Sequence, residues 1–201
     1  RKTDRYHISQ ADISVISTAS ALHDIGKIAI PEEILNKPGK FTPEEFAIMK
    51  THSMVGAEML ENLPSYQNEP LVSFAYQICR WHHERWDGRG YPDGLAGDEI
   101  PISAQIVAMA DVYDALTSER VYKPPFSHEQ AVNMIVGGEC GQFNPLMLEC
   151  LEECADEIRQ ELAAGGEQRR SQRDIQNVAR ELHRHKELTA SERSLELLEH
   201  E

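Results

Sequence analysis

Residues 82–92 read His-His-Glu-Arg-Trp-Asp-Gly-Arg-Gly-Tyr-Pro. Apolar side chains at helical spacing precede this stretch, which predicts a helix over 69–83 that ends on the paired histidines. The glycine-dense segment 87–98 follows, and its glycines indicate special backbone dihedrals rather than a regular element. Adjacent imidazoles at a helix end allow one segment of chain to reach two metal ions. The stretch therefore predicts a metal site beside an irregular loop.

Helical patterns dominate the chain on both sides of this stretch. Thr42-Pro43-Glu44-Glu45 places suitable residues at the N-cap, N1 and N3 positions of a helix, whose predicted inner face is Phe46, Met49, Gly56 and Leu60. Residues 102–117 are apolar almost all round, which predicts a central buried helix. Since no segment shows convincing two-residue alternation, we expect an all-α fold. The predicted helices cover about 13–22, 42–60, 69–83, 102–117, 127–136 and 144–164.

The composition excludes several classes of protein. Among 201 residues, 34 are acidic and 20 are basic, and the net charge of −14 argues against a general nucleic-acid-binding surface. No stretch approaches the ~18 apolar residues of a membrane span. The first residues lack the apolar region of a signal peptide. The four cysteines form no Cys-x-x-Cys pair, which predicts reduced thiols in a cytoplasmic protein.

Gly165-Gly166 marks the clearest boundary, because the composition beyond it changes to Glu, Arg, Gln, His and Leu. We expect a globular domain over 1–154 and a helical extension over 155–201. Leucines at heptad-like spacing suit a coiled coil, which predicts a homodimer formed through this extension. A frayed surface tail is the alternative.

Four of the nine histidines differ from the rest in their placement. His23 and His52 lie on or beside apolar helix faces, and His82 and His83 are adjacent. Any one of them alone reads as a hydrogen-bonded core residue. Together with Asp24 and Asp111 they form a ligand set suited to Fe, Mn or Zn.

Asp111 lies in the middle of the apolar helix 102–117. An unpaired carboxylate buried there would cost several kcal/mol, so it must meet a cation or a strong hydrogen-bond donor. A hydrogen bond within the core is the alternative to metal binding.

Residues 82–92 resemble the H-H-E-x-x-D-G-x-G-Y-P signature of HD-GYP domains, and His23-Asp24 within LHDIGKIAIP resembles their H-D motif. The resemblance continues through NKPGKFTPEEFAIMKTH and GLAGDEIPISAQIVAMADVYDALTSERVYK, and it covers roughly residues 16–154. It implies an all-α HD-domain helical bundle with a Gly-Tyr-Pro loop, which the C-terminal extended helix expected from the composition follows. It also implies a bacterial, metal-dependent phosphodiesterase that hydrolyses cyclic di-GMP.

The resemblance assigns roles to individual residues. Catalysis falls to His23, Asp24 and Lys27, with Asp24 bridging two ions and Lys27 on the scissile phosphate. Arg120 and Lys123 match the family's phosphate-contacting pair, and Gly90, Tyr91 and Pro92 form the loop beside the substrate. Asp87 and Asp114 are implied to lie next to the metal ligands and to orient them, without binding the metal themselves. The implied metal ligands are His23, Asp24, His52, His82, His83 and Asp111.

The implied reaction uses two or three divalent ions, Fe or Mn. A hydroxide on the metal attacks phosphorus and opens the ring to linear pGpG, and further cleavage gives GMP. The implied setting is a signalling protein with a receiver or sensor module, as in a two-component response regulator. One alternative is a catalytically weak or inactive cyclic-dinucleotide sensor or dimerisation module. Another is an enzyme for a mixed purine cyclic dinucleotide or another phosphoester.

Three departures from the family pattern stand out. The family carries an acidic residue and a histidine about one helix before the H-D motif, where this chain offers only His7, so we expect that the first helix is missing. Gln105 stands where relatives often carry Arg. Asn144 stands where they often carry Asp, and we expect it to begin a helix equally well.

Overall fold

The computed structural model describes residues 5–66, 68–118 and 124–164. The chain divides into two compact units, Arg1–Glu152 and Glu153–Glu201. Over the described residues every regular element is a helix, and the only strand-like feature is the isolated bridge between Asp87 and Ala96. The predicted all-α class is therefore confirmed. The helices are α1 (Gln10–Ala19), α2 (Glu32–Leu35), α3 (Pro43–Glu61), α4 (Pro70–Trp81), α5 (Ile102–Thr117) and α6 (His128–Val136), with short 3₁₀ turns η1 (Ser20–Leu22), η2 (Ile25–Ala29), η3 (Pro64–Tyr66) and η4 (Gly97–Glu99).

Side-chain caps determine where several helices begin. Thr42 caps α3 and Ser127 caps α6, each within a reciprocal capping box, and Ser9 does the same for α1. These contacts satisfy backbone N–H groups that have no partner inside a helix. The predicted starts of α3 and α6 are confirmed, as is a helix over 145–164. The first predicted helix ends earlier, at Ala19, and the short helix α2 was not predicted.

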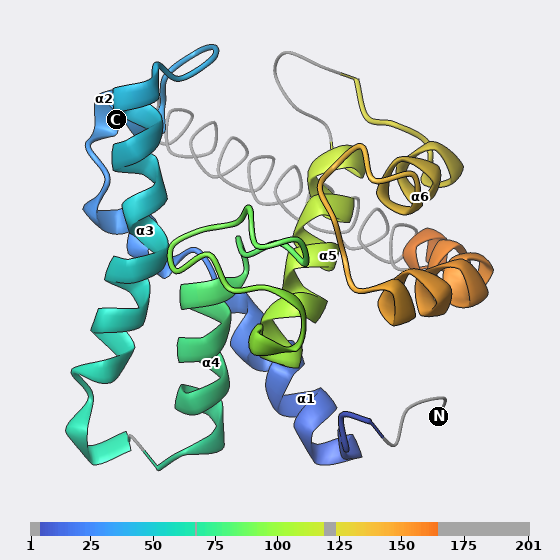
Figure 1. Cartoon of the computed structure of the whole chain (residues 1–201), viewed down its shortest axis with the longest axis horizontal. Helices are drawn as coiled ribbons and strands as arrows, with labels where there is room; N and C mark the ends of the chain where they lie inside the picture. Colours follow the sequence, from blue (N-terminus) through green and yellow to red (C-terminus); the bar gives the residue numbers. More distant parts are fainter. Residues whose placement is uncertain (1–4, 67, 119–123, 165–201) are drawn as a thin grey trace, which may run out of the picture. The chain divides into compact units, whose positions relative to one another are not determined.

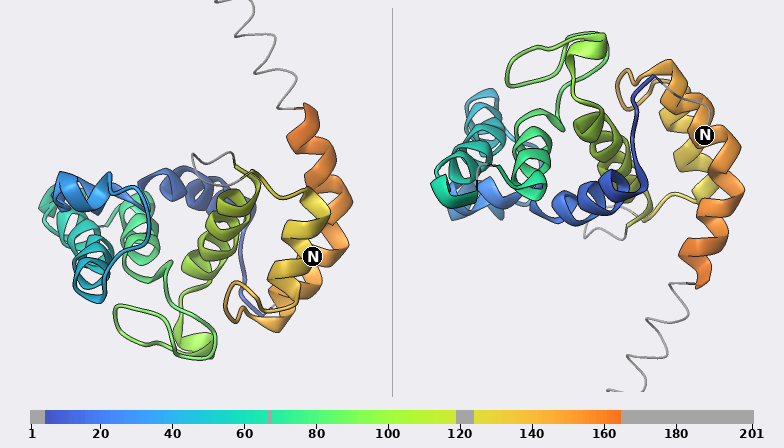
Figure 2. Two further views of the ribbon diagram at one scale, coloured as in Figure 1. Left: turned by 90° about the horizontal axis from the view of Figure 1, so that it is seen from above. Right: turned by 90° about the horizontal axis from the view of Figure 1, so that it is seen from below.

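Small side chains allow four helices to pack closely. Ala19 of α1, Ala57 of α3 and Ala75 of α4 are fully buried in one cluster with Ile78, and Val107 of α5 joins the same cluster. Burying a side chain such as Ile78 contributes about 1.5–3 kcal/mol. Figure 1 shows α3 and α4 side by side, with α5 beyond α4. The two views in Figure 2 place α1 and the glycine-rich loop on opposite sides of α4 and α5.

Two expectations about buried faces were wrong. Phe46, assigned to the inner face of α3, is 45% exposed, because the buried residues of that helix begin only at His52. Helix α5 is not buried all round, since Ala110 is exposed and borders a hollow of about 730 Å³ between α1 and α5. Ile13 of α1 also borders this hollow and is half exposed, so α1 covers α5 only in part.

The departures at Gln105 and Asn144 form one contact. Both side chains are buried, and the Asn144 amide donates to the Gln105 carbonyl over 2.9 Å. The Gln105 amide donates to the Ile100 carbonyl over 2.7 Å, and Asn144 also donates to the Tyr6 hydroxyl. Asn144 Oδ1 accepts from the Leu146 N–H, as a helix cap does. A neutral amide pair therefore occupies the positions of the two expected departures, and it avoids the desolvation cost of a buried ion pair.

Replacing one partner of this amide pair should be costly. Asn144→Asp keeps the helix cap but turns a carboxylate oxygen toward Gln105 Oε1, so we expect a loss of about 2 kcal/mol in the free energy of unfolding. Gln105→Arg together with Asn144→Asp restores a paired contact and should recover part of that loss. Denaturant unfolding of the four proteins measures this coupling. Additive effects of the two substitutions would contradict the account.

Candidate metal centre

A close backbone approach brings the H-D segment to α3. Gly26 lies in η2, and a Cβ built at this position would be 1.9 Å from the carbonyl oxygen of His52 and 2.5 Å from the Gly56 nitrogen. Only glycine allows this contact. As a result, Asp24 lies beside the candidate ligand on α3, and its Oδ1 is 3.4 Å from His52 Nε2.

The backbone fixes the orientation of three imidazoles. Nδ1 of His23, His52 and His82 lies 2.8, 2.7 and 2.8 Å from a carbonyl oxygen of its own preceding turn. A carbonyl only accepts, so Nδ1 carries the proton and Nε2 is turned toward the cluster. Metal-binding histidines are typically oriented by such a hydrogen bond.

Two of these Nε2 atoms are buried without a partner. His52 and His82 are each 1% exposed, and their Nε2 atoms accept no hydrogen bond among the described residues. Burial lowers the pKa of His52 and brings that of His82 to about 4. Burial likewise lowers the pKa of His83 to about 2. Neutral imidazoles with unused lone pairs are costly in a core but suit a metal ion.

Asp24 faces both sides of the cluster. Its Oδ1 faces His52, whereas its Oδ2 lies 3.3 Å from His23 Nε2 and 2.5 Å from Lys27 Nζ. Burial raises the pKa of Asp24, but hydrogen bonds from His23 and Lys27 outweigh it and hold the pKa well below the ordinary value. One group of candidate ligand atoms lies within 4.8 Å of one another and comprises Asp24, His52, His82 and His83.

The other side of Asp24 is formed by His23 and Asp111. Asp111 Oδ1 lies 3.7 Å from His23 Nε2. Hydrogen bonds to Asp111 and Asp24 raise the pKa of His23 to about 10, because the two carboxylates stabilise positive charge between them. The residues therefore suit a cation on each side of Asp24. On one side are the unpaired buried nitrogens of the imidazoles, and on the other are His23 and Asp111.

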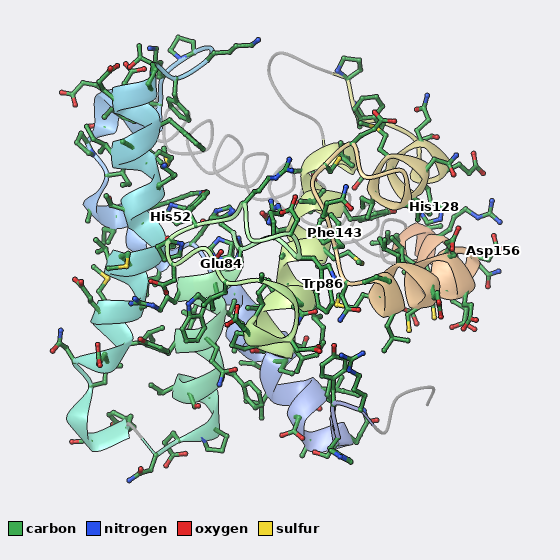
Figure 3. The ribbon with its side chains drawn as sticks, viewed as in Figure 1. His52, Glu84, Trp86, His128, Phe143 and Asp156 are labelled. Carbon is green, nitrogen blue, oxygen red and sulfur yellow. The ribbon has the colours of Figure 1, made fainter. Side chains whose placement is uncertain are left out.

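Two carboxylates hold the glycine-rich loop against the end of α4. Glu84 is 3% exposed, and its Oε1 accepts from the backbone N–H of Asp93 over 2.7 Å and of Gly94 over 3.0 Å. The Asp93 side chain in turn accepts from Arg80 over 2.8 and 3.0 Å and from Trp81 over 2.7 Å. Figure 3 labels Glu84 beside this loop and His52 on α3.

The same contacts place the Gly-Tyr-Pro residues over the ligands. A Cβ at Gly90 would lie 2.3 Å from the Glu84 Cα, so the loop passes closely over the end of the helix. The Tyr91 ring stacks on His83, with centroids 4.7 Å apart and planes at 27°. The Tyr91–Pro92 peptide bond is cis.

The structure brings together all six predicted ligands but not every predicted site residue. Asp87 accepts from the Arg89 N–H within the loop, and Asp114 accepts from Ser118 on the exposed side of α5. The contacts of these two carboxylates lie away from the ligand imidazoles. Arg120 and Lys123 fall outside the described residues.

Four residues of this site were not predicted from the sequence. Glu84 lies within the motif at 82–92 and Asp93 directly follows it, and the signal available for Glu84 was a carboxylate directly after the paired histidines. Phe46 and Lys50 of α3 approach Tyr91, which only the folded chain reveals.

Comparisons with known proteins indicate the family of the chain. The family model described as HD domain matches residues 5–143. A cyclic di-GMP phosphodiesterase of Vibrio cholerae serotype O1 is 45% identical over 143 residues, which are 71% of this chain and 29% of that protein. A 3'3'-cGAMP-specific phosphodiesterase 2 of the same organism is 43% identical over 153 residues, 76% of this chain and 28% of that protein. The chain thus spans about a third of the length of these curated relatives.

A solved structure shares the fold. The HDG"Y"P protein Bd1817 of Bdellovibrio bacteriovorus superposes with a TM-score of 0.56 at 21% identity, covering 76% of this chain and 45% of that one. Over the described residues, none of the helices has the length and apolar character that crossing a membrane requires. The match of the family model over most of the chain, together with the HD-GYP motifs, shows that the chain belongs to the HD domain family.

Proposed function

We propose that this domain hydrolyses a cyclic purine dinucleotide, with cyclic di-GMP as its first substrate, as a metal-dependent phosphodiesterase. The observation that carries the proposal is the pair of buried, unpartnered Nε2 atoms beside Asp24, whose two oxygens face two groups of ligands. Such a site suits a phosphate diester despite the net charge of −14, because bound cations reverse the local sign of charge.

The residues would hold two ions around Asp24. His52, His82 and His83 provide nitrogens on one side, and His23 with Asp111 provides the other. We propose Fe or Mn as the metal. Two ions are the smaller expected number, and three are the larger. When bound, such ions supply Lewis acidity toward the phosphoryl oxygens.

The chain's own residues bind and orient the diester. The Lys27 ammonium lies against Asp24 Oδ2 and is 39% exposed, so it can donate to a non-bridging phosphate oxygen while it stays beside the ligands. We assign the same task to Arg120 and Lys123. The loop at Gly90, Tyr91 and Pro92 covers His83 and limits the access of water to that ligand.

A mixed cyclic dinucleotide is a second candidate substrate. It is favoured by the 43% identity to a relative named for 3'3'-cGAMP. Metal ligands do not read the bases, so the two candidates share the chemistry proposed above. The proposed products are the linear dinucleotide pGpG and, after further cleavage, GMP.

We also propose that the domain works in the cytoplasm as part of a longer signalling protein with a receiver or sensor module. The matching segment is about a third of each relative, which supports this view. The predicted homodimer depends on 165–201, which lie outside the described residues.

The activity is tested with the chain loaded with Mn²⁺ or Fe²⁺ and given cyclic di-GMP or 3'3'-cGAMP, with products separated by chromatography. We expect ring opening, and a loss of roughly 100-fold or more in Asp24→Asn, because that substitution removes one of the two carboxylate oxygens. Glu58→Gln, on the exposed side of α3, should leave the rate unchanged. A metal-loaded chain that binds either dinucleotide without cleaving it would support the sensor alternative.

Metal binding has its own test in thermal unfolding. Adding Mn²⁺ should raise the melting temperature of the wild-type chain, since the ion binds only the folded state. His52→Leu removes the unpartnered Nε2 and also the hydrogen bond from Nδ1 to the Met49 carbonyl, so we expect little net change of stability without metal but a smaller rise with it. His7→Gln, at an exposed histidine, serves as the matched control. An equal rise in all three proteins would show that the ion binds elsewhere.

A further inference from the structure

Beyond the metal ligands, a row of rings leads outward from the cluster. His52 and His83 have ring centroids 5.0 Å apart, Tyr91 stacks on His83, and Phe46 meets Tyr91 edge to face with centroids 6.2 Å apart. The row begins at a buried ligand and ends at Phe46, which is 45% exposed. An aromatic surface thus starts where the metal site ends.

Lys50 adds a positive charge to this surface. It lies one helical turn after Phe46 on α3, and its ammonium is 5.3 Å from the centroid of the Phe46 ring and 5.8 Å from that of Tyr91. Within the described part of the chain it forms no ion pair, whereas Lys27 is paired with Asp24. The charge of Lys50 is therefore available to an anion beside the rings.

Core packing does not explain Phe46. The buried residues of α3 lie between His52 and Leu60, so the first turns of the helix project beyond the core. The aromatic contact of Phe46 is with Tyr91, and Tyr91 is held by the loop that Glu84 and Asp93 anchor. An exposed ring on a rigid helix, fixed beside a metal cluster, suits the binding of a flat apolar group.

We propose that Phe46, Lys50 and Tyr91, together the aromatic platform, bind one nucleotide of the substrate, with Phe46 against the purine and Lys50 on a phosphate oxygen. This inference rests on the proposed function. A cyclic dinucleotide whose scissile phosphate lies at the metal site extends past that site, so one of its nucleotides is left to contact other residues. Base stacking on aromatic side chains tolerates different bases, so the platform accepts a purine without distinguishing guanine from adenine. Lys50 acts as a point charge toward the phosphate.

The platform is tested by the kinetics of cyclic di-GMP hydrolysis by the metal-loaded chain. Phe46→Ala should raise KM by about 10-fold, while kcat and metal content stay near wild type. Phe46→Trp should restore KM because it restores a stacking surface. Ile48→Ala, at another exposed apolar residue of α3, is the matched control. A KM in Phe46→Ala no higher than in Ile48→Ala would overturn the proposal.

A binding measurement separates this inference from the proposed activity. Calorimetry compares GMP with ribose 5-phosphate, which keeps the phosphate and lacks the base. The platform predicts that Phe46→Ala weakens only GMP, whereas Lys50→Ala weakens both ligands and Lys40→Ala weakens neither. Equal weakening of the two ligands by Phe46→Ala, or none, would exclude stacking. A wild-type chain that shows the predicted binding pattern but cleaves no cyclic dinucleotide would contradict the activity and support the platform.

Discussion

Two buried imidazole nitrogens without hydrogen-bond partners are the constraint on which the site depends. Leaving polar atoms unpaired in a core costs free energy, and His52 and His82 each carry this cost. Their Nδ1 atoms are held by backbone carbonyls, so the Nε2 atoms cannot turn away without breaking those bonds. Asp24 lies against one of them with a second oxygen directed toward His23. Cations held on the two sides of Asp24 would satisfy these groups and would offset the cost of leaving the nitrogens unpaired.

The rest of the structure delivers side chains to this place. Gly26 allows η2 to lie against α3, and small buried side chains allow α1, α3 and α4 to pack closely. Two carboxylates anchor the loop. Glu84, at the end of α4, accepts from the loop backbone, and Asp93, in the loop, accepts from side chains of α4. The loop then stacks Tyr91 on a ligand, so the metal site and the proposed aromatic platform share one support.

Much of this could be predicted from the sequence, for reasons that differ between elements. Capping residues act within one helical turn, so the sequence alone predicted that helices begin at Thr42 and Ser127. The H-D and H-H-E motifs place four of the six proposed ligands next to one another in the sequence, whereas His52 and Asp111 lie far from both motifs and join the others only in the folded chain. The exposure of Phe46 was not predictable, because helical periodicity assumes a neighbour along the whole helix, and α3 is buried only from His52 onward. The contact between Gln105 and Asn144 joins positions 39 apart, and only the folded chain shows that two separate departures are one pair.

The central proposal is that Asp24 and the Nε2 atoms of this cluster would hold metal ions between them. Anomalous diffraction from crystals of the Mn²⁺-loaded chain tests it most directly. The account predicts anomalous peaks on both sides of the Asp24 carboxylate, one within about 2.2 Å of His52 Nε2 and His82 Nε2 and the other beside His23 and Asp111. A fully loaded crystal whose only peaks lie away from Asp24, with His52 Nε2 and His82 Nε2 still unliganded, would contradict it.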